Sequence, residues 1–308
     1  MEKKRILITG GTGFIGRALA GELAAAGFEV IALTRNPGTS DSLFGPGVRS
    51  EKWDGRTAVG WGLLADGSLA IINLAGDNLA EGRWTRAKKA RILQSRVEAG
   101  AAVVEAVKAV SQKPEVVVQA SAVGAYGDRG DEELDEFSLP GKGFLADVVR
   151  QWEDSTREVE AMGVRRVVIR SGLVLGQGAG VFPRLLAPFR LFAGGPLGNG
   201  RQWFSWIYLG DEIRAIRFLV EREELSGVFN LAAPNPLREK EFCHALGKAL
   251  RRPCWLPVPA FVLRCLFGEK AGETLLAGQR VLPKRLIKAG FEFRHPDAES
   301  ALKDLLQS

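Results

Sequence analysis

The sequence is poor in the residues that most often move protons or bind metals. Its 308 residues include two tyrosines, two histidines and three cysteines. The cysteines form no CxxC pair and have no histidine cluster nearby, so we expect buried thiols in a reducing compartment and no metal site. No apolar run approaches the roughly 20 residues that a membrane span needs. Because the chain begins with charged residues and then enters an apolar strand, we also expect no signal peptide, no membrane partner and a cytoplasmic location.

The net charge of +6 is unevenly distributed along the chain. Residues 1–179 hold 23 Lys and Arg against 23 Asp and Glu, whereas residues 180–308 hold 19 against 13. A cleft formed by the C-terminal part would therefore favour a small anionic substrate, although a basic surface that only aids solubility explains the same excess. Basic residues are not interleaved with aromatic ones, so we expect no nucleic acid partner. The oligomeric state cannot be read from the sequence, and a homodimer stays an open alternative.

The N-terminal segment carries the most informative motif. An apolar run, Arg5–Thr9, passes through a glycine cluster into an amphipathic helix, Phe14–Ala26. The free N–H groups and the positive dipole end of such a helix form an anion site. Gly10 permits the turn, Gly13 lets a pyrophosphate approach the main chain, and Gly16 lets the helix pack close to the strand. The motif predicts dinucleotide binding, with an ordinary strand-to-helix turn as the alternative.

Apolar strand-like runs alternate with helical patterns over the first 170 residues or so. This alternation predicts an α/β fold with a doubly wound, Rossmann-type parallel sheet. The expected strands are Arg5–Thr9, Glu29–Leu33, Arg49–Trp53, Leu69–Leu74, Glu115–Ala120 and Arg165–Arg170, and the expected helices are Phe14–Ala26, Thr85–Val110 and Phe144–Met162. Two short strands, Phe204–Leu209 and Val228–Leu231, should follow later in the chain.

The pattern changes after Gly172, where glycine-rich loops at 176–180 and 194–200 interrupt the chain. We expect residues 1–176 to form the dinucleotide-binding domain, with 204–231 returning to it. The expected substrate-binding part is smaller and mostly helical, and comprises residues 177–203 and 232–308. Its expected helices are Glu239–Leu250, Pro259–Phe267, Lys270–Ala277, Pro283–Ala289 and Asp297–Leu306.

Two residues of the second loop region are candidates for substrate binding. Arg201 can bond an anion, and Trp203 can stack on a ring. The alternative is that the tryptophans of this segment anchor the core.

The end of the second strand distinguishes NADP from NAD. Folds that bind NAD usually carry an acidic residue there for the ribose 2′-hydroxyl. In this sequence, Thr34 and Arg35 stand at that point. A hydroxyl and a guanidinium suit a 2′-phosphate, whereas a carboxylate would repel one. We therefore predict NADP, with a surface arginine as the alternative. The fourth strand ends in the small segment Leu74–Gly76, which would let the chain lie flat against the cofactor.

Several motifs resemble those of the extended branch of the short-chain dehydrogenases/reductases, which includes nucleotide-sugar epimerases and dehydratases. These motifs are Gly10–Gly16, Asn73–Gly76 and Trp206–Asp211. Longer segments resemble one atypical subgroup, an epimerase-like family with a short C-terminal domain of unknown function, which would begin near residue 255. These segments are Gly82–Trp84, Ser95–Glu98, Gly194–Trp203, Ala232–Pro236 and Gly278–Pro283.

The resemblance implies a set of cofactor contacts. It places Arg96 where ordinary extended members have an asparagine, on a helix from which a cation could reach the cofactor phosphates. It places Val174 where the chain passes the nicotinamide. The other residues expected to contact NADP are Thr12, Phe14, Ile15, Thr34, Arg35, Leu74 and Ala75.

The catalytic pair of this superfamily is absent. Its reductases use Tyr-x-x-x-Lys, in which the lysine lowers the pKa of the acid/base tyrosine. Tyr126 is followed four residues later by Gly130, and Tyr208 by Glu212. Phe144 and Val148 stand where the pair should be, and neither can move a proton. The atypical subgroup also lacks this pair, so the departure agrees with the resemblance.

Two polar residues near the expected site remain as catalytic candidates. Ser121 ends the fifth strand, where relatives have a catalytic serine or threonine, although its alignment needs either one inserted residue or a one-place shift. Tyr126 is the only tyrosine in that loop; packing beside the nicotinamide is its alternative role. Asp147 and Glu153 on the following helix are more typical of solvated residues than of bases. The charged turn Asp128–Glu132 would either cover the site or be an exposed loop.

The sequence thus predicts an NADP-dependent oxidoreductase or nucleotide-sugar epimerase-like enzyme with a non-standard proton donor. The alternative is a non-catalytic protein that binds NADP(H) as a sensor or regulator.

Overall fold

The computed structural model describes residues 4–307, apart from the side chains of residues 39–41. Its centre is a seven-stranded sheet formed by β1 (Arg5–Thr9), β2 (Glu29–Thr34), β3 (Val48–Lys52), β4 (Ala70–Asn73), β5 (Val116–Ala122), β7 (Arg165–Ser171) and β11 (Gly227–Leu231). The strands lie in the order β11-β7-β5-β4-β1-β2-β3, and neighbouring strands pair in parallel. The predicted Rossmann-type sheet is confirmed.

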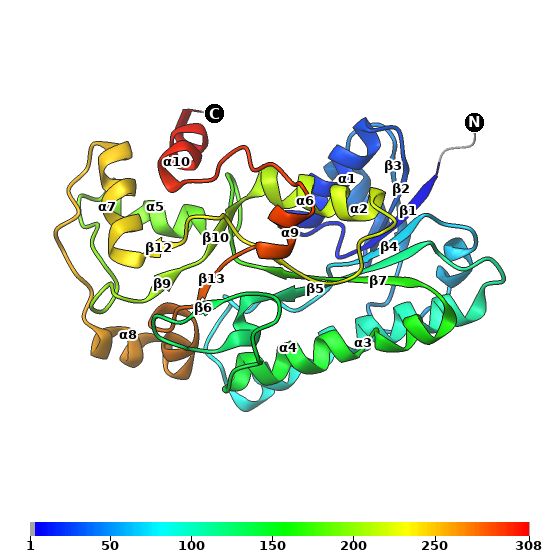
Figure 1. The fold of residues 1–308 in the computed structure, drawn as a ribbon, viewed down its shortest axis with the longest axis horizontal. Coiled ribbons are helices and arrows are strands. Elements are labelled where there is room, and N and C mark those ends of the chain that lie inside the picture. The colour runs from blue at the N-terminus through cyan, green and yellow to red at the C-terminus, as the bar shows by residue number, and fades with distance from the viewer. Residues whose placement is uncertain (1–3, 308) are drawn as a thin grey trace.

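Helices cover both faces of this sheet (Figure 1). One face carries α1 (Phe14–Ala25) and α6 (Leu209–Glu221), and the other carries α3 (Arg86–Ala109) and α4 (Phe144–Asp154). Ile6 and Ile8 pack into the core on the side of α1, whereas Leu7 packs into the core on the side of α3. Because alternate residues of a strand point to opposite faces, the continuous apolar run of β1 supplies both cores.

The C-terminal part forms a separate core against one end of the sheet. Buried residues of α5 (Phe182–Arg190), α7 (Glu239–Leu250) and α10 (Ala298–Gln307) share it. Smaller helices are α2 (Pro37–Ser40), α8 (Ala260–Phe267) and α9 (Lys284–Lys288), with 3-10 helices at Asp41–Leu43, Gly62–Ala65, Val123–Tyr126 and Arg157–Met162. Within residues 4–307, no helix is both long and apolar enough to cross a membrane.

Three strand pairs join segments that are distant in the sequence. β8 (Leu173–Leu175) pairs in parallel with β10 (Trp206–Tyr208), and β9 (Trp203–Phe204) pairs antiparallel with β12 (Leu237–Arg238). β6 (Glu133–Leu134) pairs in parallel with β13 (Arg280–Val281). These pairs tie the loops after the central strands to the C-terminal part.

The helix expected over Phe144–Met162 is broken, which corrects the sequence prediction. It ends at Asp154, and a 3-10 helix follows at Arg157–Met162. The Ser155 hydroxyl donates to the Trp152 carbonyl at 2.6 Å, and the buried Thr156 hydroxyl accepts from Arg166 at 3.1 Å. Hydroxyl side chains that bond locally in this way compete with the helical backbone bonds.

Other expectations also need correction. The sequence pattern does not predict α5 or α6, and the segment expected as a helix at Lys270–Ala277 is a π-helical turn at Ala271–Leu275. The three thiols are not all buried, because Cys265 is exposed and Cys254 is only half-buried.

The C-terminal part also caps the helix that stands where the catalytic one is expected. The Glu273 carboxylate accepts from the backbone N–H groups of Phe144 and Leu145 at 3.3 and 3.2 Å. A Cβ at the cap residue Gly143 would lie 2.7 Å from this carboxylate, so the approach is close. A negative charge at a helix N-terminus is favourable, and this one fixes the position of α4 relative to the last third of the chain.

Candidate functional site

The glycine-rich turn after β1 is in direct backbone contact with the end of β4. Gly10 has φ +67°, which is left-handed, and a Cβ there would lie 2.9 Å from the Leu74 carbonyl carbon. A Cβ at Gly16 would lie 2.3 Å from the Gly10 carbonyl oxygen. Glycine is required at both positions because any side chain would push the turn away from β4 or from α1.

The N-terminus of α1 is free of its own side-chain caps. Its cap residue, Gly13, donates its N–H to the Gly10 carbonyl at 2.9 Å and has no side chain to bond the following N–H groups. The first turn of α1 contains no acidic residue. The partial positive charge of this helix end is therefore not neutralised by the helix itself, which leaves an anion site.

The glycine-rich loop at 176–180 packs against the first residue of α1. A Cβ at Gly176 or Gly180 would lie 2.6 or 2.9 Å from the Phe14 ring. Phe14 therefore has a packing partner on this loop, in addition to the cofactor contact predicted for it.

The predicted cofactor residues lie at the carboxyl ends of neighbouring parallel strands. Gly10 follows β1, Thr34 ends β2, and Leu74–Gly76 follows β4. β1 pairs with β2 on one side and with β4 on the other, so the strand order reverses at this point. Ligands of doubly wound sheets bind in the crevice at such a reversal. Val174 lies further along, in β8, and is half-buried.

The structure places Thr34 and Arg35, the residues predicted to bind a 2′-phosphate, at the carboxyl end of β2. Thr34 is 7% exposed, and its hydroxyl oxygen lies 3.4 Å from the Asn36 backbone nitrogen, which donates to it. Arg35 is exposed and makes no ion pair with a carboxylate among the residues that the structure describes. Its charge is therefore available to an anion at the carboxyl end of β2.

Arg96 packs against the loop that follows β4 and bonds its backbone. It is 7% exposed, and its guanidinium donates to the carbonyls of Asp77 and Ile92 at 3.1 and 2.9 Å. The guanidinium also stacks on Trp152 at 4.8 Å, and a Cβ at Gly76 would lie 3.0 Å from it. Burial lowers the pKa of Arg96 to about 10, opposed by the charge of Asp77. A positioning role for Arg96 thus accompanies the phosphate contact predicted from the resemblance.

Apolar packing occupies the two positions of the missing catalytic pair. Phe144 contacts the Trp84 ring edge-on, with the centroids 5.2 Å apart, and the Lys89 ammonium lies 4.4 Å from its centroid. Val148 is buried. Neither position offers a group that can take or give a proton.

Ser121 belongs to a partly buried ionic network that the sequence pattern does not predict. Its hydroxyl donates to Glu153 at 2.6 Å, and Arg170 forms a two-point ion pair with the same carboxylate at 2.7 and 2.9 Å. Burial alone would lower the pKa of Arg170, but the bound Glu153 carboxylate raises it. The expectation of a solvated Glu153 is therefore wrong. The pairing could not be read from the sequence because Glu153 and Arg170 lie on different elements.

Tyr126 is fully buried and bonded. Its hydroxyl donates to the Asn230 side-chain oxygen at 2.7 Å, and the Arg170 guanidinium lies 5.0 Å from its ring centroid. Burial raises the pKa of Tyr126, which the charge of Arg170 only partly offsets. A general acid works best with a pKa near the working pH, so this environment favours the packing alternative.

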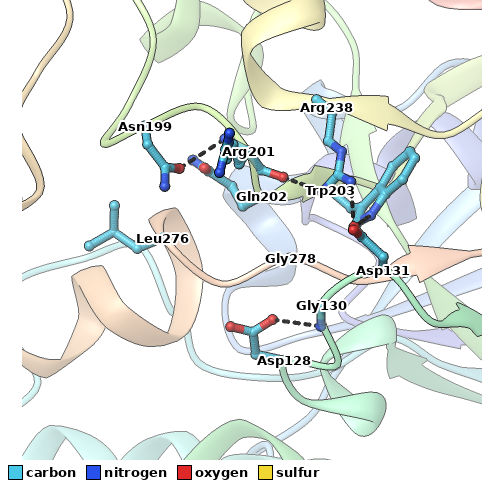
Figure 2. A pocket seen from close by; sticks show the side chains of 10 residues that line it. All are labelled: Asp128, Gly130, Asp131, Asn199, Arg201, Gln202, Trp203, Arg238, Leu276 and Gly278. Atoms are coloured by element: carbon cyan, nitrogen blue, oxygen red, sulfur yellow. Dashed lines mark hydrogen bonds and ion pairs between the residues drawn. The ribbon is translucent and has the colours of Figure 1, made fainter.

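Both predicted substrate residues line one cavity of about 530 Å³ (Figure 2). Trp203 donates its indole N–H to Asp131 at 2.9 Å, and the guanidinium groups of Arg238 and Arg280 lie 4.0 and 4.8 Å from its ring centroid. The cavity is lined by Asp128, Gly130, Asp131, Asn199, Arg201, Gln202, Trp203, Arg238, Leu276 and Gly278. The charged turn singled out in the sequence thus contributes to the wall of this cavity.

Some of the charged side chains that line this cavity form ion pairs with each other, and others do not. Arg238 forms an ion pair with Asp131, and the Trp203 and Arg238 hydrogen bonds hold the pKa of Asp131 below its usual range. Arg201 is exposed and has no carboxylate partner in the described part of the chain. The cavity therefore presents one available guanidinium beside an aromatic ring, and an anionic substrate stays a prediction.

The carboxyl group of Glu212, in α6, is fully buried beside Ser171, the last residue of β7. Ser171 donates its hydroxyl to one oxygen of Glu212 at 2.5 Å, and the other oxygen has no partner among the described residues. Burial raises the pKa of Glu212 to about 8, although the Ser171 bond opposes this. Glu212 therefore retains its proton in the folded protein at neutral pH. Among the described residues, no group of three or more His, Cys, Asp and Glu could hold a metal ion.

The protonated state of Glu212 predicts a pH dependence of stability. Its pKa is raised from 4.5 to about 8 in the folded state, so the unfolded chain releases the proton first. The free energy of unfolding should fall as the pH rises through this interval. Glu212→Gln should reduce that fall by at least about 1 kcal/mol between about pH 5 and about pH 8, as measured by denaturant unfolding.

Glu221→Gln is the matched control, because Glu221 lies on the same helix and is 41% exposed beside Arg217. This variant should keep the pH dependence of the unaltered protein. The assignment is wrong if Glu212→Gln and Glu221→Gln give the same pH profile.

Two family models match the chain. The NAD dependent epimerase/dehydratase family matches residues 6–232, and a domain of unknown function, DUF1731, matches residues 258–305. The Bacillus subtilis epimerase family protein YfhF is 38% identical over 98% of this chain and 97% of its own length.

Solved structures agree with these matches. The crystal structure of human epimerase family protein SDR39U1 (isoform 2) with NADPH has a TM-score of 0.89 and 36% identity, over 98% of this chain and 99% of that one. A nucleoside-diphosphate sugar epimerase structure from Corynebacterium glutamicum has a TM-score of 0.76 and 32% identity, over 99% of this chain and 58% of that one.

Proposed function

The chain belongs to the NAD dependent epimerase/dehydratase family, and on that basis we propose that it binds NADP(H) and acts as an atypical extended short-chain dehydrogenase/reductase, either an oxidoreductase or a nucleotide-sugar epimerase-like enzyme. The observation that carries the proposal is the uncapped N-terminus of α1, beside a turn where only glycine fits. The NADPH of the human SDR39U1 structure supports it.

The residues present fit a dinucleotide with a 2′-phosphate. The N–H groups at the start of α1, from Gly13 onward, would bind the pyrophosphate. Thr34 and Arg35 would bind the 2′-phosphate by a hydroxyl bond and a charge, and no carboxylate ends β2 to repel it. Leu74, Ala75 and Val174 would line the crevice. When bound, the nicotinamide supplies hydride transfer.

Ser121 is the better placed of the two candidates for moving a proton. Its Oγ lies at the carboxyl end of β5 and donates to the Glu153 carboxylate at 2.6 Å. Ser121 can therefore accept a proton from a substrate hydroxyl as its own proton passes to the Glu153 carboxylate, which Arg170 holds in place. Tyr126 would act by positioning, through its bond to Asn230. Arg201 and Trp203 would bind the substrate in the cavity of Figure 2.

A non-catalytic NADP(H) sensor is the second candidate. Phe144 and Val148 favour it, because apolar packing replaces both groups of the usual acid/base pair. Such a protein would bind the cofactor without turnover. Its binding to a partner would then change as the NADPH/NADP ratio changes.

Arg35→Glu tests the cofactor assignment. Reversing this charge should weaken NADPH binding by about tenfold or more, because the 2′-phosphate loses an ion pair and meets a like charge. NADH binding should change much less, since NADH lacks that phosphate. Titration of both cofactors by fluorescence measures this, with Arg222→Glu, a 54% exposed arginine that follows α6, as the control. An equal loss for NADPH and NADH would refute the NADP assignment.

A turnover assay distinguishes the enzyme proposal from the sensor proposal. The protein is incubated with NADPH and a panel of carbonyl and nucleotide-sugar compounds, and both cofactor absorbance and product composition are followed. Product analysis is needed because epimerisation leaves the absorbance unchanged. We expect turnover of at least one compound, reduced about a hundredfold or more by Ser121→Ala. Tight NADPH binding with no product from any compound would instead favour the sensor.

A further inference from the structure

The protein has an exposed apolar surface near the C-terminal end of α5 and the start of α8. The proposed function gives this surface no role. We call it the α5–α8 patch and define it by five side chains with high exposure: Leu191 at 78%, Phe192 at 53%, Trp255 at 66%, Leu256 at 48% and Phe261 at 68%. The segments that follow α5 and α7 run beside each other there (Figure 1). Large apolar side chains gathered on one surface usually mark an interaction site.

The patch is held in shape by main-chain bonds. The N–H groups of Trp255 and Leu256 both donate to the Gly194 carbonyl, at 2.9 and 3.1 Å. The Trp255 indole donates to the Phe192 carbonyl at 2.9 Å. Phe192 itself has φ +59°, a left-handed conformation that few non-glycine residues adopt. This conformation ends α5, because it lets the Ala193 N–H donate to the Pro188 carbonyl at 2.9 Å.

Arginines without acidic partners adjoin the patch. Arg190, Arg251, Arg252 and Arg264 are all exposed. None of the four forms an ion pair with a carboxylate in the part of the chain that the structure describes. The Arg252 guanidinium lies 4.1 Å from the Phe192 ring centroid, so at least one of these charges contacts the patch directly.

This combination points to one occupant by its chemistry. The patch combines large apolar side chains with unpaired arginines. Such a combination matches a surface that is apolar inside and negatively charged outside. A second copy of the chain would bring the same arginines face to face across a two-fold axis, which like-charge repulsion opposes. We propose that the α5–α8 patch docks the protein reversibly on a membrane surface rich in anionic lipids.

The proposal revises the sequence-based expectation of no membrane partner. That expectation depended on the absence of spanning apolar runs, and a peripheral surface needs none. Docking of this kind adds to the proposed function and does not depend on it.

Vesicle co-sedimentation tests the proposal on the full chain. The probes are phosphatidylcholine vesicles with and without phosphatidylserine, at low and high salt. The protein should bind only the anionic vesicles and should be released by salt. Arg251→Glu with Arg252→Glu, and separately Trp255→Ser with Phe261→Ser, should each weaken binding by about tenfold or more.

Leu63→Ser is the matched control, because Leu63 is 76% exposed and lies in the 3-10 helix Gly62–Ala65. It should bind vesicles as the unaltered protein does, and circular dichroism should show that every variant is folded. Three results would overturn the proposal: no binding to anionic vesicles, equal binding by the patch variants and the control, or a dimer in sedimentation velocity that the patch substitutions dissociate.

Discussion

The candidate site depends on one backbone contact, between the turn at Gly10 and the end of β4 at Leu74. A Cβ at Gly10 would lie 2.9 Å from the Leu74 carbonyl carbon, and a Cβ at Gly16 would lie 2.3 Å from the Gly10 oxygen. These approaches hold α1 close to the sheet, with its uncapped N-terminus at the point where the strand order reverses. Arg96 and the Gly176–Gly180 loop then pack against this arrangement from two sides.

The second constraint is that apolar residues stand at the two positions where the superfamily has its catalytic tyrosine and lysine. Phe144 packs on Trp84, and Glu273 caps the helix that Phe144 begins. The polar groups that remain nearby, Ser121 and Tyr126, are each hydrogen-bonded to another side chain. Any acid/base chemistry here would therefore need groups other than the usual tyrosine and lysine.

Local patterns predicted the central fold because each strand and the glycine turn carry their signals within a few residues. The sequence pattern does not predict α6, because this helix follows β10 directly and the side chain of its cap residue, Tyr208, makes no capping hydrogen bond. α5 was missed because it contains Pro188 and has another proline in its first turn. The Arg170–Glu153 pair and the Asp131–Arg238 pair join different elements, so no spacing rule could predict them.

The most direct test of the account compares two glycines of α1. Gly16→Ala should reduce NADPH affinity about tenfold or more, because its methyl group would displace the Gly10 turn. Gly21→Ala should leave affinity unchanged, since nothing lies within 4 Å of a Cβ there. Calorimetric titration of the two folded variants measures the difference. Equal NADPH affinity in the two variants would contradict the claim that this turn forms the cofactor site.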